Sequence, residues 1–310
     1  MEQSSGIVDY ESRDFRQFWE TPSKKILKDR EMKLVRKLLP DTEGWFFDIG
    51  AGFGRLVPAY YRENRKILLI DYSIKHLQMA AETYKDRDMA FIAANACRLP
   101  FRSSVFMNGI AVRLFHHIDR PSDFVFELAR ILTGEGHALI SFLNKRNLLR
   151  LLRYGQAGYN HGHSLLWPAT YGTSPKYFRS LMHQAGLMPM RKRGVGFLHQ
   201  ITSNLPILEK SIGLFPVSAS FFSFIDGIIG RALGGLDLAL MQYILVKKQM
   251  EKHNCSQGTK LRDILACPRC RSTELAGWHD GYRCRSCEME FPLRGKVLDF
   301  RFTESAHAHE

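Results

Sequence analysis

The sequence predicts an α/β fold in which a parallel sheet is covered by helices on both faces, followed by a small cysteine-rich module. Short apolar runs alternate with stretches of helical periodicity, and this is the pattern of a doubly wound sheet. A turn with three alternating glycines, Gly50, Gly52 and Gly54, follows the first run. Further along the chain, four cysteines form two close pairs.

The elements are expected in a regular order along the chain. The first is a helix within residues 10–39, where apolar side chains recur at helical spacing. The expected strands are 45–47, 67–70, 90–94, 109–114, 138–143, 188–199 and 240–247. The main helices among them are expected at 74–85, 121–132 and 175–186. For the helix at 121–132, Asp119 or Ser122 is the expected N-cap and Gly134 the expected stop signal.

Composition and charge indicate a globular protein that favours anionic partners. The 310 residues are 45% hydrophobic and 24% charged, which argues against a long disordered chain, and the formal net charge is +13. The N-terminal residues include several acids and do not resemble a secretory signal. The uncharged run 211–225 contains Pro216 and is shorter than the roughly 20 residues of a membrane-spanning helix. A cytoplasmic protein is therefore expected.

We expect two domains joined by a linker. The larger domain, residues 1–248, includes a helical insertion at about 203–240. The polar stretch 249–259 is interpreted as the linker. The cysteine-rich domain is expected at 260–303, with a polar tail at 304–310.

The segment from Asp48 to Arg55 is a glycine-rich turn at the point where a strand passes into a helix. Its glycines allow a ligand to approach the backbone, and the following helix offers free N–H groups. A dinucleotide-binding fingerprint needs Gly or Ala where Arg55 stands, and a P-loop needs a Lys-Ser/Thr pair, so neither motif fits. Asp71 ends the next expected strand, where an acid can accept both hydroxyls of a ribose. The alternative is a tight turn beside a surface acid.

Residues 45–145 closely resemble class I methyltransferases, which use S-adenosylmethionine (SAM). By this resemblance, the turn from Asp48 to Gly54 holds the methionine part of SAM, Asp71 binds the ribose, and Tyr72 lies beside the adenine. The segment 95–101 resembles the family's third motif, with Asn95 in place of the usual acid. The relatives nearest by pattern include quinone-ring and other small-molecule methyltransferases. The cofactor-binding residues that the resemblance implies are Asp48, Gly50, Ala51, Gly52, Gly54, Asp71, Tyr72, Asn95, Ala96 and Arg113.

Catalysis of methyl transfer requires alignment of the nucleophile with the methyl group and exclusion of water, and a base only when the nucleophile must lose a proton. His116 and His117 follow the fourth expected strand, at the carboxyl edge where ligands of open α/β sheets bind. Each is a candidate general base, and the alternative is a structural residue beside the pocket. Arg113 is interpreted as an inward-facing residue, with the same choice between a role in the site and a structural role.

Two segments bear on the methyl acceptor. Residues 144–175 mix basic and aromatic side chains, which suits an anionic or aromatic acceptor or nucleic acid, and equally suits a solvated basic helix with core aromatics. The apolar segment 205–240 has three interpretations: a helical lid over the active site, a dimer face, or an interfacial membrane contact. A hydrophobic lid favours a hydrophobic acceptor.

The two cysteine pairs, Cys267 with Cys270 and Cys284 with Cys287, have the spacing of zinc knuckles. Four thiolates leave no open position, so the expected zinc ion is structural. Residues 260–301 resemble small zinc-ribbon proteins that bind and activate RNA and protein methyltransferases. The resemblance implies that the ribbon covers an apolar flank of the methyltransferase domain. A competing interpretation is an RNA-docking module that uses Arg269, Arg271, Arg283 and Arg285.

Three functions follow from these patterns. The leading one is a SAM-dependent methyltransferase that acts on a small hydrophobic or anionic acceptor, which would be quinone-, lipid- or metabolite-like. The second is a tRNA or rRNA methyltransferase whose fused ribbon acts as activator or RNA-docking module. Residues 114–117 lack the Asn-Pro-Pro-Tyr type of motif used for amino-group methylation, which argues against nitrogen acceptors. The third is a SAM-binding scaffold without turnover, against which the intact glycine turn and Asp71 argue.

Overall fold

The computed structural model describes residues 16–151, 172–195, 216–249 and 260–302. The strands of the larger domain are β1 (Trp45–Ile49), β2 (Lys66–Asp71), β3 (Met89–Ala93), β4 (Phe106–Ala111), β5 (Leu132–Leu143), β6 (Leu187–Val195) and β7 (Met241–Lys248). Its helices are η1 (Gln17–Glu20), α1 (Pro22–Leu38), α2 (Val57–Tyr60), α3 (Ile74–Thr83), η2 (Phe115–His117), α4 (Pro121–Ile131), α5 (Leu148–Leu151), α6 (Pro175–Gln184) and α9 (Pro216–Gly235). The C-terminal module consists of α10 (Leu261–Ile264), β8 (Leu275–Trp278), β9 (Gly281–Cys284), β10 (Glu290–Arg294) and β11 (Val297–Asp299).

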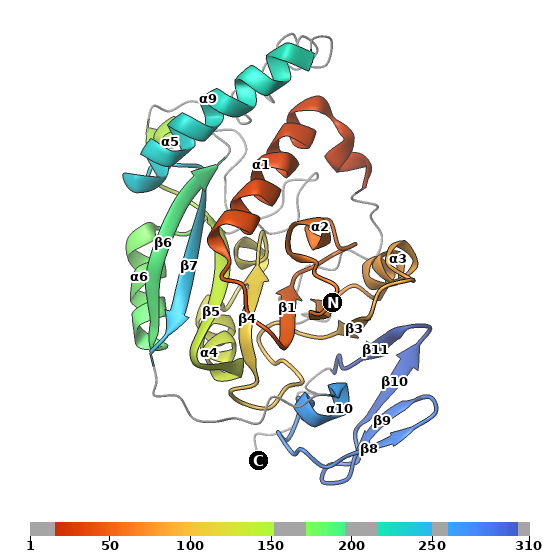
Figure 1. Ribbon diagram of the computed structural model, residues 1–310. Coiled ribbons are helices and arrows are strands. Elements are labelled where there is room, and N and C mark those ends of the chain that lie inside the picture. The colour runs from red at the N-terminus through yellow and green to blue at the C-terminus, as the bar shows by residue number, and fades with distance from the viewer. Residues whose placement is uncertain (1–15, 152–171, 196–215, 250–259, 303–310) are drawn as a thin grey trace, which may run out of the picture.

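The strands form one sheet in the order β6-β7-β5-β4-β1-β2-β3-β11-β10-β9-β8. Figure 1 shows helices on both sides of this sheet and the C-terminal strands beyond β3. The predicted α/β class with helices on both faces is therefore confirmed.

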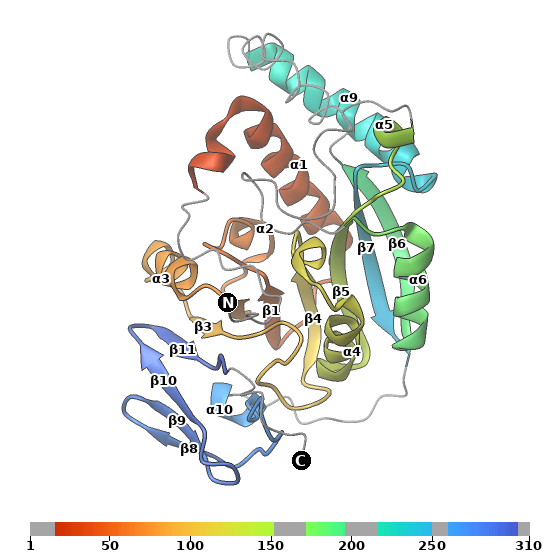
Figure 2. The same ribbon diagram turned by 180° about the vertical axis from the view of Figure 1, so that it is seen from behind.

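Two apolar cores lie on opposite faces of the sheet, because successive side chains of each strand point to opposite sides. One core joins the strands to α4 and α6, through Phe124 and Phe178 among others. The other joins them to α1, α2 and α3, through Val35, Tyr60 and Leu77 among others. Figure 2 shows α4 and α6 on the face nearer the viewer in that orientation. Strands buried on both faces explain the continuous apolar runs of the sequence.

The sheet is mixed, whereas the sequence pattern predicted a parallel one. Strands β1 to β5 are parallel to one another, but β7 pairs antiparallel with both β5 and β6. The reason is the connection through α9. Since β6 ends at the carboxyl edge and the chain returns to that edge before β7, β7 must run in the opposite direction.

Several element boundaries differ from the predicted ones. A break at Thr21 separates η1 from α1, because Pro22 occupies the first position of the helix. Strand β4 covers 106–111 rather than 109–114, since Arg113 adopts a left-handed conformation that ends the strand. Helix α4 has Arg120, not Asp119 or Ser122, at its N-cap position, and it passes directly into β5 at Leu132, so that Gly134 lies within a strand.

The C-terminal module continues the sheet of the larger domain. Residues 297–299 of β11 pair in parallel with residues 91–93 of β3. Just beyond β11, the N–H of Phe300 donates to the carbonyl of Ala93 at 2.8 Å. The module therefore covers the edge of the sheet that β3 would otherwise expose. The proposed linker lies almost wholly in 250–259, outside the described residues, as does the polar tail.

Candidate cofactor and metal sites

The turn after β1 is shaped by glycines in left-handed conformations. Gly50, Gly52 and Gly54 have φ angles of 76°, 54° and 77°. The N–H of Gly50 donates to the carbonyl of Ile70, at the end of β2, at 2.8 Å. Around the position that a Cβ on Gly52 would take, no atom lies within 4 Å apart from its chain neighbours. This side of the turn therefore faces open space at the carboxyl edge, where a ligand can approach the backbone.

Asp71 lies beside this turn and is hydrogen-bonded to it. Its Oδ2 accepts from the N–H of Gly52 at 2.8 Å, and its Oδ1 accepts from the N–H of Ser73 at 2.9 Å. Burial raises the pKa of Asp71 above its usual value, while these N–H groups act in the opposite direction. Each carboxylate oxygen can accept a further hydrogen bond, so the acid retains capacity for ribose hydroxyls.

Asp48 has a supporting position. It is buried, and the hydroxyl of Tyr60 donates to its Oδ2 at 2.6 Å. Burial raises the pKa of Asp48 to about 7, although the Tyr60 hydroxyl and Arg55 act against this rise. Its carboxylate fixes the end of β1 to α2, and Ala51 beside it is also buried.

Asn95 and Ala96 begin the loop that follows β3. The side-chain carbonyl of Asn95 accepts from the N–H of Cys97 at 2.8 Å, which forms a local turn. Directly after Cys97, the guanidinium group of Arg98 donates to the carbonyl of Pro268 at 2.7 Å. The loop that resembles the adenine-binding motif is thus connected directly to the C-terminal module.

Glu127 of α4 connects the same loop to the module a second time. Its carboxylate accepts from the N–H of Leu99 at 2.6 Å and forms ion pairs with Arg130 at 2.8 Å and Arg271 at 2.9 Å. Only 6% of the Glu127 side chain is exposed. After the neighbouring strand β2, the guanidinium carbon of Arg301 lies over the ring of Tyr72, 5.3 Å from its centroid. Contacts from the module therefore reach both segments that the resemblance assigns to the adenine.

A buried ion cluster lies on the α1 face at the carboxyl edge. The carboxylate of Glu31 pairs with Arg55 at 2.7 Å and with Arg113 at 2.6 Å, and it accepts from the hydroxyl of Tyr243. Burial alone would raise the pKa of Glu31, but Arg113, Arg55 and the Tyr243 hydroxyl bring it below its usual value. The ring of Trp19 lies 3.8 Å from the guanidinium carbon of Arg55 and 5.1 Å from that of Arg113.

This cluster presents positive charge beside the cofactor turn. Two guanidinium groups face one carboxylate, and Arg55 directly follows Gly54. Arg113 has a φ of 60°, and its N–H donates to the hydroxyl of Ser141 at 2.7 Å. Since 24% of its side chain is exposed, Arg113 can meet an anionic group from solvent.

His116 and His117 lie at the same edge in η2, with ring centroids 4.1 Å apart. His116 is buried, and its Nδ1 has no hydrogen-bond partner within the described parts of the chain. Burial, followed by the charges of His117 and Arg113, lowers the pKa of His116 well below 6.5. The imidazole of His116 is therefore neutral near pH 7 and can accept a proton, although weakly.

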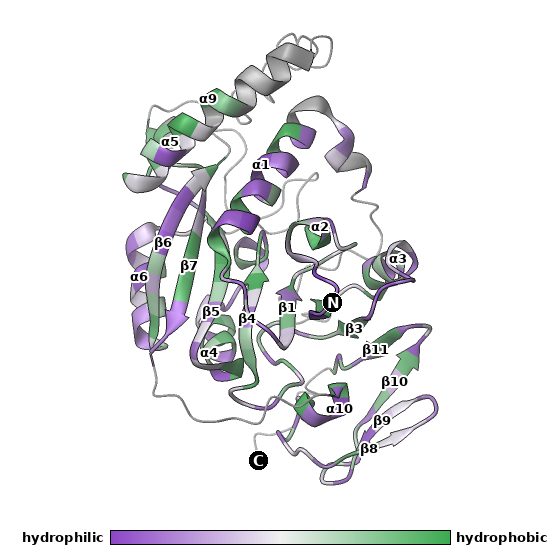
Figure 3. Cartoon of the chain, viewed as in Figure 1, coloured by the Kyte–Doolittle hydropathy of each residue, from purple (hydrophilic) through white to green (hydrophobic). Residues whose placement is uncertain are grey.

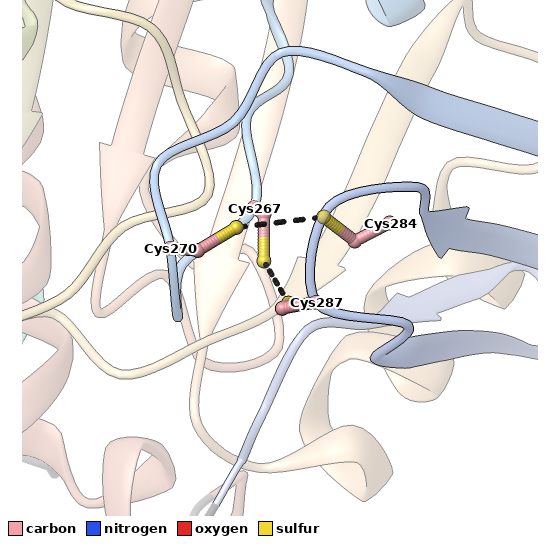
Figure 4. Close-up of side chains that lie close together, drawn as sticks. All are labelled: Cys267, Cys270, Cys284 and Cys287. Atoms are coloured by element: carbon pink, nitrogen blue, oxygen red, sulfur yellow. Dashed lines mark hydrogen bonds between the residues drawn. The ribbon is translucent and has the colours of Figure 1, made fainter.

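The four cysteines of the C-terminal module converge on one point (Figure 4). All four Sγ atoms lie within 4.8 Å of one another, with Cys267 and Cys287 at 3.6 Å and Cys270 and Cys284 at 3.5 Å. Zinc–sulfur bonds of about 2.3 Å in a tetrahedron place sulfur atoms about 3.8 Å apart, so the donor set suits zinc. This cluster suggests a closed, structural zinc site.

Glu31 and Glu127 were not among the residues predicted from the sequence, although each carries a recognisable signal. Glu31 lies between the buried Leu27 and Val35, one turn away on either side of α1. Glu127 follows the buried Phe124 by one turn of α4. An acid within the apolar stripe of a helix is rarely buried unless it is paired. The pattern therefore indicates a buried carboxylate, but the partners become visible only in three dimensions.

Comparison with known proteins gives the same type of domain. Residues 47–140 match the sequence profile of the methyltransferase domain family. A Listeria monocytogenes protein described as an S-adenosylmethionine-dependent methyltransferase superposes with a TM-score of 0.51 at 15% identity, over 73% of this chain and 100% of that one. A chain in the complex of the Haloferax volcanii Trm112 methyltransferase activator with a methyltransferase superposes with a TM-score of 0.50 at 14% identity, over 78% of this chain and 100% of that one. The [4+2]-cyclase SpnF superposes with a TM-score of 0.50 at 18% identity, over 72% of this chain and 82% of that one. Among proteins of curated function, none matches the sequence.

At these identities the structural likeness concerns the fold, while the sequence profile concerns the family. The matched residues extend from β1 into β5 and include the glycine turn, Asp71 and the loop after β3. SAM is the cofactor that this family implies. Residues 47–140 therefore belong to a SAM-dependent methyltransferase domain.

Proposed function

We propose that the enzyme transfers the methyl group of SAM to a small acceptor that is hydrophobic or anionic. The observation that carries this proposal is the cluster of Arg55 and Arg113 beneath Trp19, held by the buried Glu31. The cluster offers an aromatic ring and net positive charge next to the cofactor turn. This combination suits a carboxylate, a phosphate or the oxygen of an ionised ring.

The proposed cofactor site uses the turn from Gly50 to Gly54 for the methionine part, Asp71 for the ribose, and Tyr72 with Asn95 and Ala96 for the adenine. SAM, when bound, supplies the electrophilic methyl group. The chain contributes the alignment of the acceptor and the exclusion of water. Open backbone at Gly52 and the remaining acceptor capacity of Asp71 support this assignment.

Substitution of Asp71 tests the cofactor site. Asp71→Ala removes the ribose acceptor and releases the N–H groups of Gly52 and Ser73, so we expect SAM affinity to fall at least 100-fold, about 2.7 kcal/mol. Isothermal titration calorimetry measures this, with the exposed Asp86→Ala as the matched control. Unchanged SAM affinity in Asp71→Ala would show that the site is elsewhere.

The base, where one is needed, is assigned to His116 or His117. If the acceptor loses a proton during transfer, replacement of the responsible histidine by Asn should lower kcat by about 100-fold while SAM affinity is retained. An equal, small effect of both substitutions would assign the pair a structural role only.

The class of acceptor is tested by transfer of labelled methyl groups from SAM into a cell lysate. Label that survives nuclease treatment and moves into an organic solvent supports a hydrophobic acceptor, and label that survives in the aqueous phase as a small molecule supports an anionic one. Loss of the label on nuclease treatment overturns both.

The C-terminal module is proposed to be a zinc ribbon that acts as a built-in stabiliser of the methyltransferase domain. Pairing of β11 with β3 and the contacts of Arg98 and Glu127 support this role. A zinc ion held by the four thiolates would supply much of the folding free energy of such a small module. In this proposal the relevant partner of the ribbon is its own chain.

A second candidate function is methylation of tRNA or rRNA. It is favoured by the net charge of +13 and by the similarity to a chain from the Haloferax volcanii complex that contains a methyltransferase activator. In this case Arg269, Arg283 and Arg285 would contact RNA. Nuclease-sensitive label in the transfer experiment would establish this alternative.

A further inference from the structure

Helix α9 has an apolar exposed side. Phe224 is 65% exposed and Ile228 is 52% exposed, and their spacing of four residues places them on the same side of the helix. Ala232 and Gly235 continue this exposed side, and Leu236, just beyond the helix, is 68% exposed. Leu151 of α5 is also more than half exposed, and α5 lies next to α9 in both views (Figures 1 and 2).

The opposite side of α9 is fixed by close backbone contacts. A Cβ on Gly230 would lie 2.5 Å from the carbonyl oxygen of Gly194 in β6, and one on Gly234 would lie 2.3 Å from the Gly194 nitrogen. Likewise, a Cβ on Gly227 would lie 2.3 Å from the guanidinium group of Arg30 in α1. Because only glycine fits at the two backbone contacts with Gly194, α9 cannot turn its apolar side inward without losing them.

Basic residues border the apolar side where α1 meets α9. Arg30 contacts α9, and Lys33 and Lys37 follow it at three and seven residues, so they lie on the same side of α1. Both lysines are exposed, as is Arg231 of α9, one turn after Gly227. Figure 3 shows α1 as largely hydrophilic beside the hydrophobic segments of α9.

The size and charge of this surface decide between its potential occupants. From Phe224 to Leu236 the stripe extends for about 18 Å and is one helix wide, which is too small for the roughly 800 Å² that each partner buries in a stable complex. A second copy of the chain would also bring like charges of Lys33, Lys37 and Arg231 together. A lipid surface has neither difficulty, because apolar side chains enter the headgroup region while lysines meet lipid phosphates.

We infer that α9 and the adjoining side of α1 form a docking face for membranes that contain anionic lipids. No helix within the described residues is long and apolar enough to cross a membrane, so α9 would lie in the plane of the interface. The contact with Gly194 places α9 at the carboxyl end of β6, which is the edge that carries the cofactor turn. Delivery of a lipid-like acceptor from this face to the site rests on the proposed function, whereas docking itself does not.

Vesicle co-sedimentation of the full-length protein tests the docking face. Binding is expected to vesicles of phosphatidylcholine with phosphatidylglycerol, to be much weaker with phosphatidylcholine alone, and to decline with added salt. The double variant Phe224→Ser/Ile228→Ser should bind roughly tenfold more weakly. Lys33→Gln/Lys37→Gln should bind anionic vesicles roughly 30-fold more weakly, since each lysine near the surface contributes about 1 kcal/mol.

Matched controls are the exposed Phe126→Ser on α4 and Lys75→Gln on α3, which should bind like the wild type. SAM affinity is measured for every variant and should remain unchanged, so failure of docking and failure of the cofactor assignment are distinguishable. Equal binding of all variants to anionic vesicles overturns the inference. So does a concentration-dependent dimer, detected by light scattering, that dissociates in Phe224→Ser/Ile228→Ser while no variant binds vesicles.

Discussion

The edge of the sheet that carries the cofactor turn contains buried polar groups of two kinds. The carboxylate of Glu31 is paired with Arg55 and Arg113 and accepts a hydrogen bond from the hydroxyl of Tyr243. Gln242 of β7, by contrast, is fully buried, and neither its amide oxygen nor its amide nitrogen has a partner among the described residues. A paired buried charge holds geometry, whereas an unpaired buried amide only lowers stability unless a ligand uses it.

Replacement of Gln242 tests whether its unpaired amide lowers the stability of the protein. Gln242→Met keeps the approximate volume and removes the unpaired amide, so the free energy of unfolding should rise by about 1–3 kcal/mol in a urea titration. Asn144→Leu serves as the opposite control, because its amide donates to the carbonyls of Asp237 and Ala239 and its loss should destabilise. Lower stability of Gln242→Met would indicate that the amide has a structural partner after all.

The titration of His116 predicts a pH dependence of stability. Its pKa in the folded protein lies well below 6.5, so at mildly acidic pH the unfolded chain binds a proton that the folded protein does not. Stability should therefore be fully present above about pH 6.5 and decline as the pH falls below it. In His116→Gln, the melting temperature should fall less steeply between about pH 6.5 and 5 than in the wild type. Parallel pH profiles would contradict the assignment.

At the scale of elements, α4 connects the C-terminal module to the loop after β3. Glu127 joins the N–H of Leu99 to Arg130 and Arg271 within one nearly buried group. Asp123, one turn earlier on the same helix, forms an exposed pair with Arg120. The two acids of one helix thus differ both in burial and in the number of arginines that they pair with, and their substitutions can be compared directly.

Glu127→Gln should lower the free energy of unfolding by about 2–3 kcal/mol, because two guanidinium groups lose their carboxylate. Asp123→Asn should cost less than about 1 kcal/mol, since water screens the exposed pair. Denaturant titration measures both values. Equal effects would mean that the contacts of Glu127 contribute no more than a surface ion pair.

How much of these elements the sequence could predict depends on how local their causes are. The end of β2 at Asp71 was predicted correctly, because an apolar run followed by an acid is a local pattern. The start of β4 was placed three residues late, because Met107 and Asn108 interrupt the apolar run although Asn108 is buried and donates to the carbonyl of Pro40. The SAM residues remain a prediction that follows from motif resemblance. Pairing of β11 with β3 has no local signal, since it depends on which sheet edge is free.

At the scale of the whole molecule, the ribbon and the methyltransferase domain share one sheet, and their stabilities should be coupled. Deletion of 258–310 removes β11, the contacts to Arg98 and Arg271, which is one of the two arginines paired with Glu127. We expect the melting temperature to fall by about 10 °C or more, and SAM affinity to fall with it, because the two segments proposed to bind the adenine lose their contacts with the module.

A zinc chelator should lower the melting temperature of the full-length protein by a similar amount. It should not lower the melting temperature of Cys284→Ser further, because this variant lacks one thiolate of the cluster. Differential scanning calorimetry follows both. An unchanged melting curve after deletion would mean that the ribbon is a tethered binding module.

Pairing between β3 and β11 also has a consequence for the order in which the chain is made. About 200 residues separate the two strands, so during synthesis from the N-terminus β3 emerges long before its neighbour exists. Until then, the nascent domain has an unpaired strand edge, and such edges invite pairing with other chains. Residues 297–299, only three in number, close that edge late, after the cysteines have emerged. Since the proposed zinc site can form only then, the supply of zinc in the cell would influence how long each new molecule stays exposed to misassembly.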